Sequence, residues 1–168
     1  MKLQSVDLKT LTPEIFRVFG TQNALLTAGD QNGCNTMTIG WCQLGRIWNQ
    51  PVCTVYVRPE RYTYQFMEAH DYFTVSILPE AERETMKLCG TQSGRDTDKV
   101  KACGLTVCHG AGDAPFFDEA EWVLVCKKIY AQDMDPACVV EGSRILPFYE
   151  GDGWHRIYTG QVVEAYRK

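Results

Sequence analysis

Short runs of β-branched and aromatic residues, separated by turn-forming residues, recur along the whole chain. The clearest are residues 52–57, 72–78, 121–132 and 154–166. Such residues fit the pleated surface of a sheet, and the prolines that follow the first two runs cannot continue a strand ladder. We therefore predict a mainly β fold, an antiparallel barrel with inserted helices. No repeat or Pro/Ser-rich linker divides the 168 residues, so we expect one domain over residues 1–168.

A hairpin is predicted near the start of this barrel. Residues 23–28 and 34–41 are rich in apolar and β-branched side chains, and they flank residues 29–33. The Asn-Gly pair in that short segment supplies the positive backbone angles that a tight hairpin turn requires. The order that follows is strand, helix, strand.

Helical spacing of apolar side chains marks the insertions. Helices are expected at residues 13–19, 62–67, 80–88 and 99–103. Thr12 and Pro13 suit the start of the first helix, and Gly20 is expected to end it. A polar, glycine-containing loop at residues 90–98 is expected to join the last two helices.

Charge and hydropathy exclude several classes of protein. The formal net charge of −4 argues against a broad nucleic-acid surface, because binding to the phosphate backbone needs a basic face. No apolar run approaches the roughly 18 residues that cross a bilayer, and the first ten residues lack the apolar middle of a secretory signal. We expect a cytoplasmic protein that contacts neither membrane nor nucleic acid.

The eight cysteines contain no C-x-x-C pair. Without an export signal, reduced and mostly buried thiols are favoured over disulfides. Cys103, Cys108 and His109 form the one cluster with metal-ligand chemistry, but no fourth ligand lies nearby, so no metal site is predicted. A thiol-redox function is not favoured, because no pair has active-site spacing.

Two segments carry groups that can bind an anion. Arg61 and Thr63 lie at the start of a predicted helix, where backbone amides and the helix dipole favour negative charge. Ser93 and Gly94 allow a donor-rich backbone, and the nearby cations Arg95 and Lys99 form charge-assisted bonds to phosphate oxygens. The alternative is a solvated surface on which these cations pair with Glu60, Asp96 and Asp98.

The order of these motifs resembles that of the flavin reductase family, whose members have an FMN-binding split barrel and include flavoredoxin-like proteins. The resemblance is carried by the strings NTMTIGW, WNQPVCTVYVRPERYTYQFM with the following DYFTVSIL, and CGTQSGRDTDK, and the string WHRIYTGQVVEA resembles the last barrel strand. It spans roughly residues 23 to 165. The RPxRYT and SGRDxDK strings are its most specific parts.

The resemblance implies a cofactor site for FMN. Residues against the isoalloxazine ring would be Asn35, Thr36, Met37 and Thr38; residues around the phosphate would be Arg58, Pro59, Arg61, Tyr62, Thr63, Ser93, Gly94, Arg95 and Lys99. Arg61 and Lys99 are the side chains expected to matter most. His155 is the histidine implied to lie near the cofactor, whereas His70 and His109 read as ordinary surface or loop residues.

Several aromatic and apolar residues have a simpler interpretation. Met37 and Ile39 can pack as ordinary strand residues, and Trp41, Trp48 and Tyr56 more often fill a barrel core than stack on a ring.

The implied activity is electron transfer from NADH or NADPH through FMN to an unidentified acceptor. The flavin performs the chemistry in such proteins, so no catalytic side chain is required. The chain has no G-x-G-x-x-G motif, so the nicotinamide would bind only transiently. Homodimers are common in the family, with the cofactor near the subunit interface. Alternatives are a flavoredoxin-like electron-transfer protein with a redox-protein partner, a non-catalytic FMN-binding module, and a reductase that releases reduced flavin.

Overall fold

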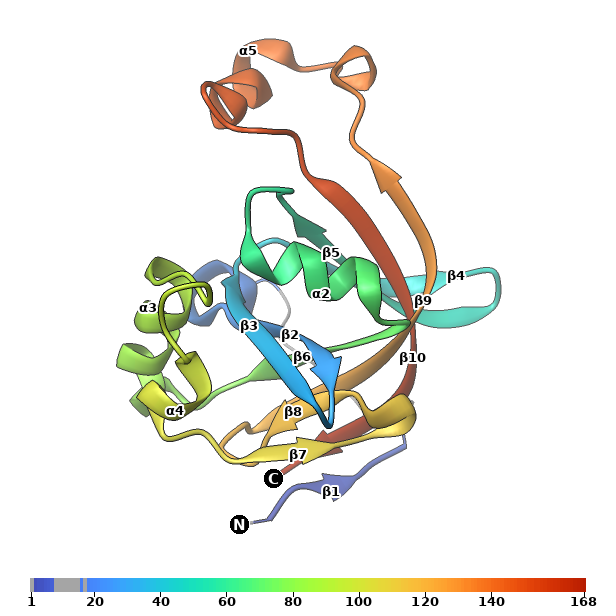
Figure 1. Ribbon diagram of the computed structural model, residues 1–168. Coiled ribbons are helices and arrows are strands. Elements are labelled where there is room, and N and C mark those ends of the chain that lie inside the picture. Colours follow the sequence, from blue (N-terminus) through green and yellow to red (C-terminus); the bar gives the residue numbers. More distant parts are fainter. Residues whose placement is uncertain (1, 8–15, 17) are drawn as a thin grey trace.

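The computed structural model describes residues 2–7, 16 and 18–168, and its main element is one antiparallel sheet (Figure 1). Seven strands follow the order β3-β2-β6-β9-β10-β5-β4, and the short strand β1 (Gln4–Ser5) pairs with β10. Strands β7 (Val107–His109) and β8 (Pro115–Phe117) form a separate pair. The mainly β fold with inserted helices is confirmed.

The predicted first hairpin is present, but its turn differs from the expected one. Strands β2 (Ala24–Asp30) and β3 (Gly33–Ile39) pair in register from Ala24 opposite Ile39 to Asp30 opposite Gly33. Neither Asn32 nor Gly33 has a positive φ. Instead the Asp30 carboxylate accepts a hydrogen bond from the Asn32 amide at 2.8 Å, which closes the turn through a side chain.

A second hairpin was not predicted. Strands β4 (Cys42–Ile47) and β5 (Gln50–Val57) are joined by Trp48 and Asn49, whose φ values are 49° and 58°. Two successive positive φ values are the mark of the type I′ turn that fits the twist of a hairpin. The strand predicted at residues 52–57 is confirmed within β5, with Arg58 and Pro59 following its end.

The helices lie between these strands. Helix α2 (Tyr62–Ala69) precedes β6 (Tyr72–Ile77), as expected. Helix α3 (Arg83–Thr91) follows a 3-10 turn at Glu80–Glu82 and continues three residues beyond the predicted end at residue 88. Helix α4 (Lys99–Cys103) has the predicted bounds because Asp98 caps its start and Gly104, with a φ of 64°, ends it.

The predicted first helix at residues 13–19 lies partly outside the described residues, since residues 12–15, with its predicted start at Thr12 and Pro13, and residue 17 are not described. The described part shows a π-helical turn at Val18–Gln22. Gly20 lies inside this turn, so the prediction that Gly20 ends the helix is wrong.

Two long strands complete the sheet. Strands β9 (Trp122–Asp133) and β10 (Arg156–Arg167) pair along most of their length, and the first half of β10 also pairs with β5. Between them, residues 134–155 form an arm that stands away from the sheet and carries α5 (Gly142–Ile145) (Figure 1). The arm is closed at its base, where the Met134 amide donates to the His155 carbonyl at 2.9 Å.

Close packing leaves no room for a side chain at one point of β10 inside the sheet. Gly160 sits between β5 and β9, and a Cβ added there would lie 2.6 Å from a Phe73 ring carbon and 2.7 Å from the Cys126 Cβ. Both of those side chains are fully buried. Glycine is therefore required at this position by close packing, although its backbone angles are ordinary.

All eight cysteines are free, three of them buried, four half-buried and Cys138 exposed. The Sγ atoms of Cys42 and Cys53 lie 3.5 Å apart. The hydrogen bond with Cys53, together with burial, raises the pKa of the Cys42 thiol, which keeps it protonated. Among the described residues no group of three or more potential ligands could hold a metal ion, and no helix is long and apolar enough to cross a membrane.

Candidate functional site

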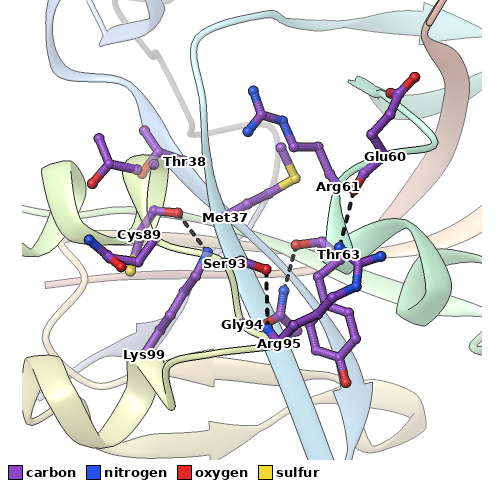
Figure 2. Close-up of a pocket in the computed structure, with 15 residues that line it drawn as sticks. Met37, Thr38, Glu60, Arg61, Thr63, Cys89, Ser93, Gly94, Arg95 and Lys99 are labelled. Carbon is purple, nitrogen blue, oxygen red and sulfur yellow. Dashed lines mark hydrogen bonds between the residues drawn. The ribbon is translucent and has the colours of Figure 1, made fainter. Parts of the chain in front are cut away.

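A cavity of about 220 Å³ opens between β3, the start of α2 and the loop at residues 92–98 (Figure 2). It is here called the main cavity because most of the predicted site residues line it, not because of its size. Ten of the predicted site residues line it: Asn35, Met37, Thr38, Arg61, Tyr62, Thr63, Ser93, Gly94, Arg95 and Lys99. These residues come from three segments that are far apart in the sequence. The fold therefore brings most of the predicted set together.

The start of α2 supplies free donors to this cavity. Arg61 occupies the N-cap with extended backbone angles and makes no side-chain cap bond. Within the described part of the chain, its guanidinium makes no hydrogen bond or ion pair, and Figure 2 shows it extended rather than folded back on the helix. Unpaired amides and the helix dipole at such a terminus favour an anion. Arg61 and the first turn of α2 therefore carry unpaired donors of the kind that an anion site needs.

The Lys99 ammonium is held by backbone carbonyls. It is 6% exposed, and Nζ donates to the Thr36 carbonyl at 2.9 Å and the Cys89 carbonyl at 2.8 Å (Figure 2). Burial lowers the pKa of Lys99. Because an ammonium has three donors, only one remains for the cavity. Lys99 thus ties β3 to the end of α3, a role that sequence reasoning did not anticipate.

The loop at residues 92–98 is pressed against β3. A Cβ on Gly94 would lie 1.9 Å from the Asn35 side-chain oxygen, so a larger residue cannot fit there without movement. The Asn35 amide is itself held by the Thr63 hydroxyl at 2.7 Å. These contacts fix the distance between β3, α2 and the loop, and so they set the width of the cavity.

Arg95 joins the same loop to the chain before α2. Its guanidinium donates to the Glu60 carbonyl at 3.3 Å and lies 5.0 Å from the centre of the Tyr62 ring. Its amide donates to the Ser93 hydroxyl at 3.2 Å. The Arg95 guanidinium therefore lines the cavity, but it already contacts a backbone carbonyl and an aromatic ring of the chain itself.

A second hollow of about 200 Å³, here called the side hollow, adjoins the main cavity. Both are lined by Met37, Thr38 and Arg61, and the other lining residues of the side hollow are Ile39, Gly40, Trp41, Tyr56, Arg58 and His155. Since the same three residues line both, one elongated ligand can reach from the anion site into an aromatic hollow.

Three predicted residues do not line the main cavity. Arg58 faces the arm, where its guanidinium donates to the Phe148 carbonyl at 2.6 Å and pairs with Asp152 at 2.7 Å. Thr36 is fully buried, so its side chain does not reach the cavity, and its carbonyl accepts a hydrogen bond from Lys99. Pro59 is exposed in the turn after β5. Arg58 also lines the side hollow, and the phosphate contacts expected of Arg58 and Pro59 stay predictions.

His155 is buried beside the side hollow. Its Nδ1 lies 3.0 Å from the Tyr149 hydroxyl, and its ring centre lies 4.9 Å from that of Trp41. Burial, with the charges of Arg58 and Arg61, lowers the pKa of His155 to about 4. The imidazole is therefore neutral at physiological pH.

Sequence reasoning missed part of the lining. Glu60 and the stretch from Cys89 to Gln92 line the main cavity, where α3 continues farther than predicted. Residues 89–92 are the first four residues of the CGTQSGRDTDK string, so the resemblance could have indicated them as lining residues. Trp41 and Tyr56 line the side hollow, whereas Trp48 is exposed and packs near Tyr130 instead.

The fold and the site define a split barrel with a donor-lined cavity that adjoins an aromatic hollow. The sequence matches the family described as flavin reductase like domain over residues 16–168. The chain belongs to this family.

Solved structures confirm the split-barrel fold. Flavoredoxin from Methanosarcina acetivorans aligns with a TM-score of 0.70 and 22% identity, covering 88% of this chain and 68% of that one. An FMN-binding domain of a flavin reductase-like enzyme from Shewanella baltica OS155 gives 0.68 and 23%, covering 98% and 76%. An NADH:FAD oxidoreductase from Streptomyces globisporus gives 0.66 and 21%, covering 98% and 87%. A search of curated proteins gave no match.

Proposed function

We propose that this protein binds FMN and passes electrons from NADH or NADPH through it to an acceptor. The observation that carries the proposal is the pairing of a free guanidinium and free helix amides with an adjoining aromatic hollow, since FMN has a phosphate at one end and a planar ring at the other. The solved structures named above include FMN-binding and NADH-oxidising proteins, which supports this choice of ligand and donor.

In this proposal the main cavity holds the phosphate. Arg61 and the amides at the start of α2 would be its principal donors, and Ser93 and Arg95 would add a hydroxyl and a second cation from the loop at residues 92–98. Charge-assisted hydrogen bonds of this kind are shorter and stronger than neutral ones. Lys99 supports the site by holding β3 and α3 together, with one donor left for the ligand.

The ring of the flavin would lie toward the side hollow. Met37 and Thr38 belong to both cavities, so β3 is the wall along which the ring and the ribityl chain would be placed. The Thr38 hydroxyl already donates to the Met86 carbonyl at 2.6 Å, so Thr38 positions the wall rather than the ligand. When bound, FMN supplies the hydride and single-electron chemistry, and the chain supplies binding and orientation.

A second candidate is a flavoredoxin-like electron-transfer protein, favoured by the structural likeness to a flavoredoxin. In that case FMN would exchange electrons with a redox protein and not with a nicotinamide. We also propose that the chain forms a homodimer and acts in the cytoplasm as a single domain. Light scattering on the purified protein tests the first of these points.

The first experiment is an absorbance spectrum of the purified protein, followed by FMN titration. NADH and then NADPH are added under anaerobic conditions to the flavin-loaded protein. A flavin spectrum that bleaches supports the reductase, and one that persists with both donors favours electron transfer or a non-catalytic module. Failure to bind FMN in titration would reject the proposal.

A further inference from the structure

Tyr149, which lies in the arm, contacts the buried histidine of the side hollow. Its hydroxyl is 3.0 Å from His155 Nδ1 and 3.5 Å from the Met134 sulfur. Tyr149 is 9% exposed and His155 is 8% exposed, so water does not compete freely for these atoms. The phenol has one proton and two neighbours that can accept it.

The Tyr149 ring is held in place from two sides. It stacks in parallel on Trp154, with ring centres 3.9 Å apart and planes inclined by 7°. The Arg58 guanidinium lies 5.4 Å from the ring centre, and Arg58 is itself anchored by Asp152. The position of the hydroxyl is thus fixed by contacts that do not involve the hydroxyl.

The proton on the phenol goes to the better acceptor. Burial raises the pKa of Tyr149, so the phenol keeps its proton, and the lowered pKa of His155 leaves its imidazole neutral. A neutral imidazole nitrogen is a good acceptor, whereas a thioether sulfur is a weak one. Donation from Tyr149 to Nδ1 puts the imidazole proton on Nε2, which makes no hydrogen bond to any described residue.

We infer that Tyr149 is a positioning residue that holds His155 as the Nε2–H tautomer and so gives the side hollow a fixed neutral N–H donor. Beside His155 the hollow then suits a planar ligand with an acceptor oxygen on its ring substituent, such as the carboxamide of a nicotinamide that lies against the proposed flavin ring. Arg61 lines the same hollow, and its guanidinium also favours a ligand oxygen that accepts hydrogen bonds. The choice of ligand rests on the proposed function, whereas the tautomer does not.

Nitrogen-15 NMR of the imidazole rings tests the tautomer on the flavin-free protein. The chain has three histidines, and loss of one signal set in His155→Gln assigns His155. We expect one Nε2–H tautomer between pH 5.5 and 8 in the wild type, and loss of this single tautomer in Tyr149→Phe, which keeps the ring stack. The matched control Tyr130→Phe removes a hydroxyl outside both cavities and should change nothing. An Nδ1–H tautomer in the wild type, or an unchanged tautomer in Tyr149→Phe, would overturn the inference.

The ligand is tested separately on FMN-loaded, oxidised protein with NAD⁺ as the probe. Addition of NAD⁺ is expected to shift the Nε2–H proton signal of His155, and a signal that does not move at saturating NAD⁺ would overturn the ligand assignment. Failure of FMN to load would instead reject the proposed function. The tautomer measurement, which needs no flavin, would still stand.

Discussion

Replacing Arg61 with alanine tests the anion site most directly. The Arg61 side chain caps no helix amide and lines the main cavity without a hydrogen-bond or ion-pair partner among the described residues, so its loss should leave the fold almost unchanged. Surface changes of this type alter the free energy of unfolding by about 0.5 kcal/mol or less. The substitution should instead weaken the binding of FMN.

The expected loss follows from one charge-assisted hydrogen bond to a phosphate. Such a bond contributes about 1.5–3 kcal/mol. Since each 1.4 kcal/mol is tenfold in affinity, the Kd of FMN should rise about 10- to 150-fold. Riboflavin has the same ring without the phosphate, so its Kd should change far less.

Flavin fluorescence titration measures both Kd values in the wild type and in Arg61→Ala. Arg46→Ala is the matched control, because Arg46 is an exposed arginine in β4 that lines neither cavity. The control should bind FMN like the wild type. An unchanged FMN affinity in Arg61→Ala would refute the phosphate site, and an equal loss for FMN and riboflavin would place Arg61 against the ring instead.

Three further changes test the framework of the site. Lys99→Met removes the ammonium from two buried carbonyls and should lower the free energy of unfolding in urea by about 1–3 kcal/mol. A result within error of wild type would contradict that structural role. Gly160→Ala should cost about 1–3 kcal/mol by overpacking, whereas Gly45→Ala, with nothing within 4 Å of the added Cβ, should not. The pKa of His155, about 4 when folded against 6.5 as its ordinary value, means that the unfolded chain binds more protons between these values. The stability that His155 contributes is therefore present above pH 6.5 and lost as the pH falls toward 4. His155→Gln should weaken this acid dependence of the urea midpoint, and His109→Gln should not; equal profiles in all three proteins would refute it.

The strands could be predicted from the sequence where a continuous run of apolar or β-branched residues ends near a proline. Residues 52–57 and 72–78 are almost continuously apolar or β-branched and end at proline, and both are strands. Strand β4 was missed because CQLGRI mixes glycine and charge with few apolar residues, and its pairing depends on the Trp48-Asn49 turn. Strand β1 has two residues and no pattern of its own; only β10 defines it.

The site was predictable as a set of segments but not as a set of contacts. Arg61 and Ser93 come from RPxRYT and SGRDxDK, the two most specific strings of the resemblance, and both line the main cavity. Arg58 comes from the same string, yet its partner Asp152 lies far along the chain, in an arm with no recognisable motif. Lys99 has the charge expected of a phosphate ligand, but its burial beneath two carbonyls depends on tertiary packing. The spacing of residues in the sequence does not show which distant residues will form such ion pairs and hydrogen bonds.

The arm at residues 134–155 leaves the sheet and returns to it at one hydrogen-bonded point, between Met134 and His155. Changes in the length of such a segment cost only the slowly growing entropy of closing a loop, and they leave the pairing of β9 with β10 intact. Yet this segment carries Tyr149 and Asp152, which hold His155 and Arg58 at the side hollow. The sheet, which must keep its pairing for the chain to fold, is thus separate from the arm, whose sequence and length can vary. The arm borders the side hollow, where the proposed ligand would bind. Specificity in such a chain can evolve in the arm with little penalty to the barrel.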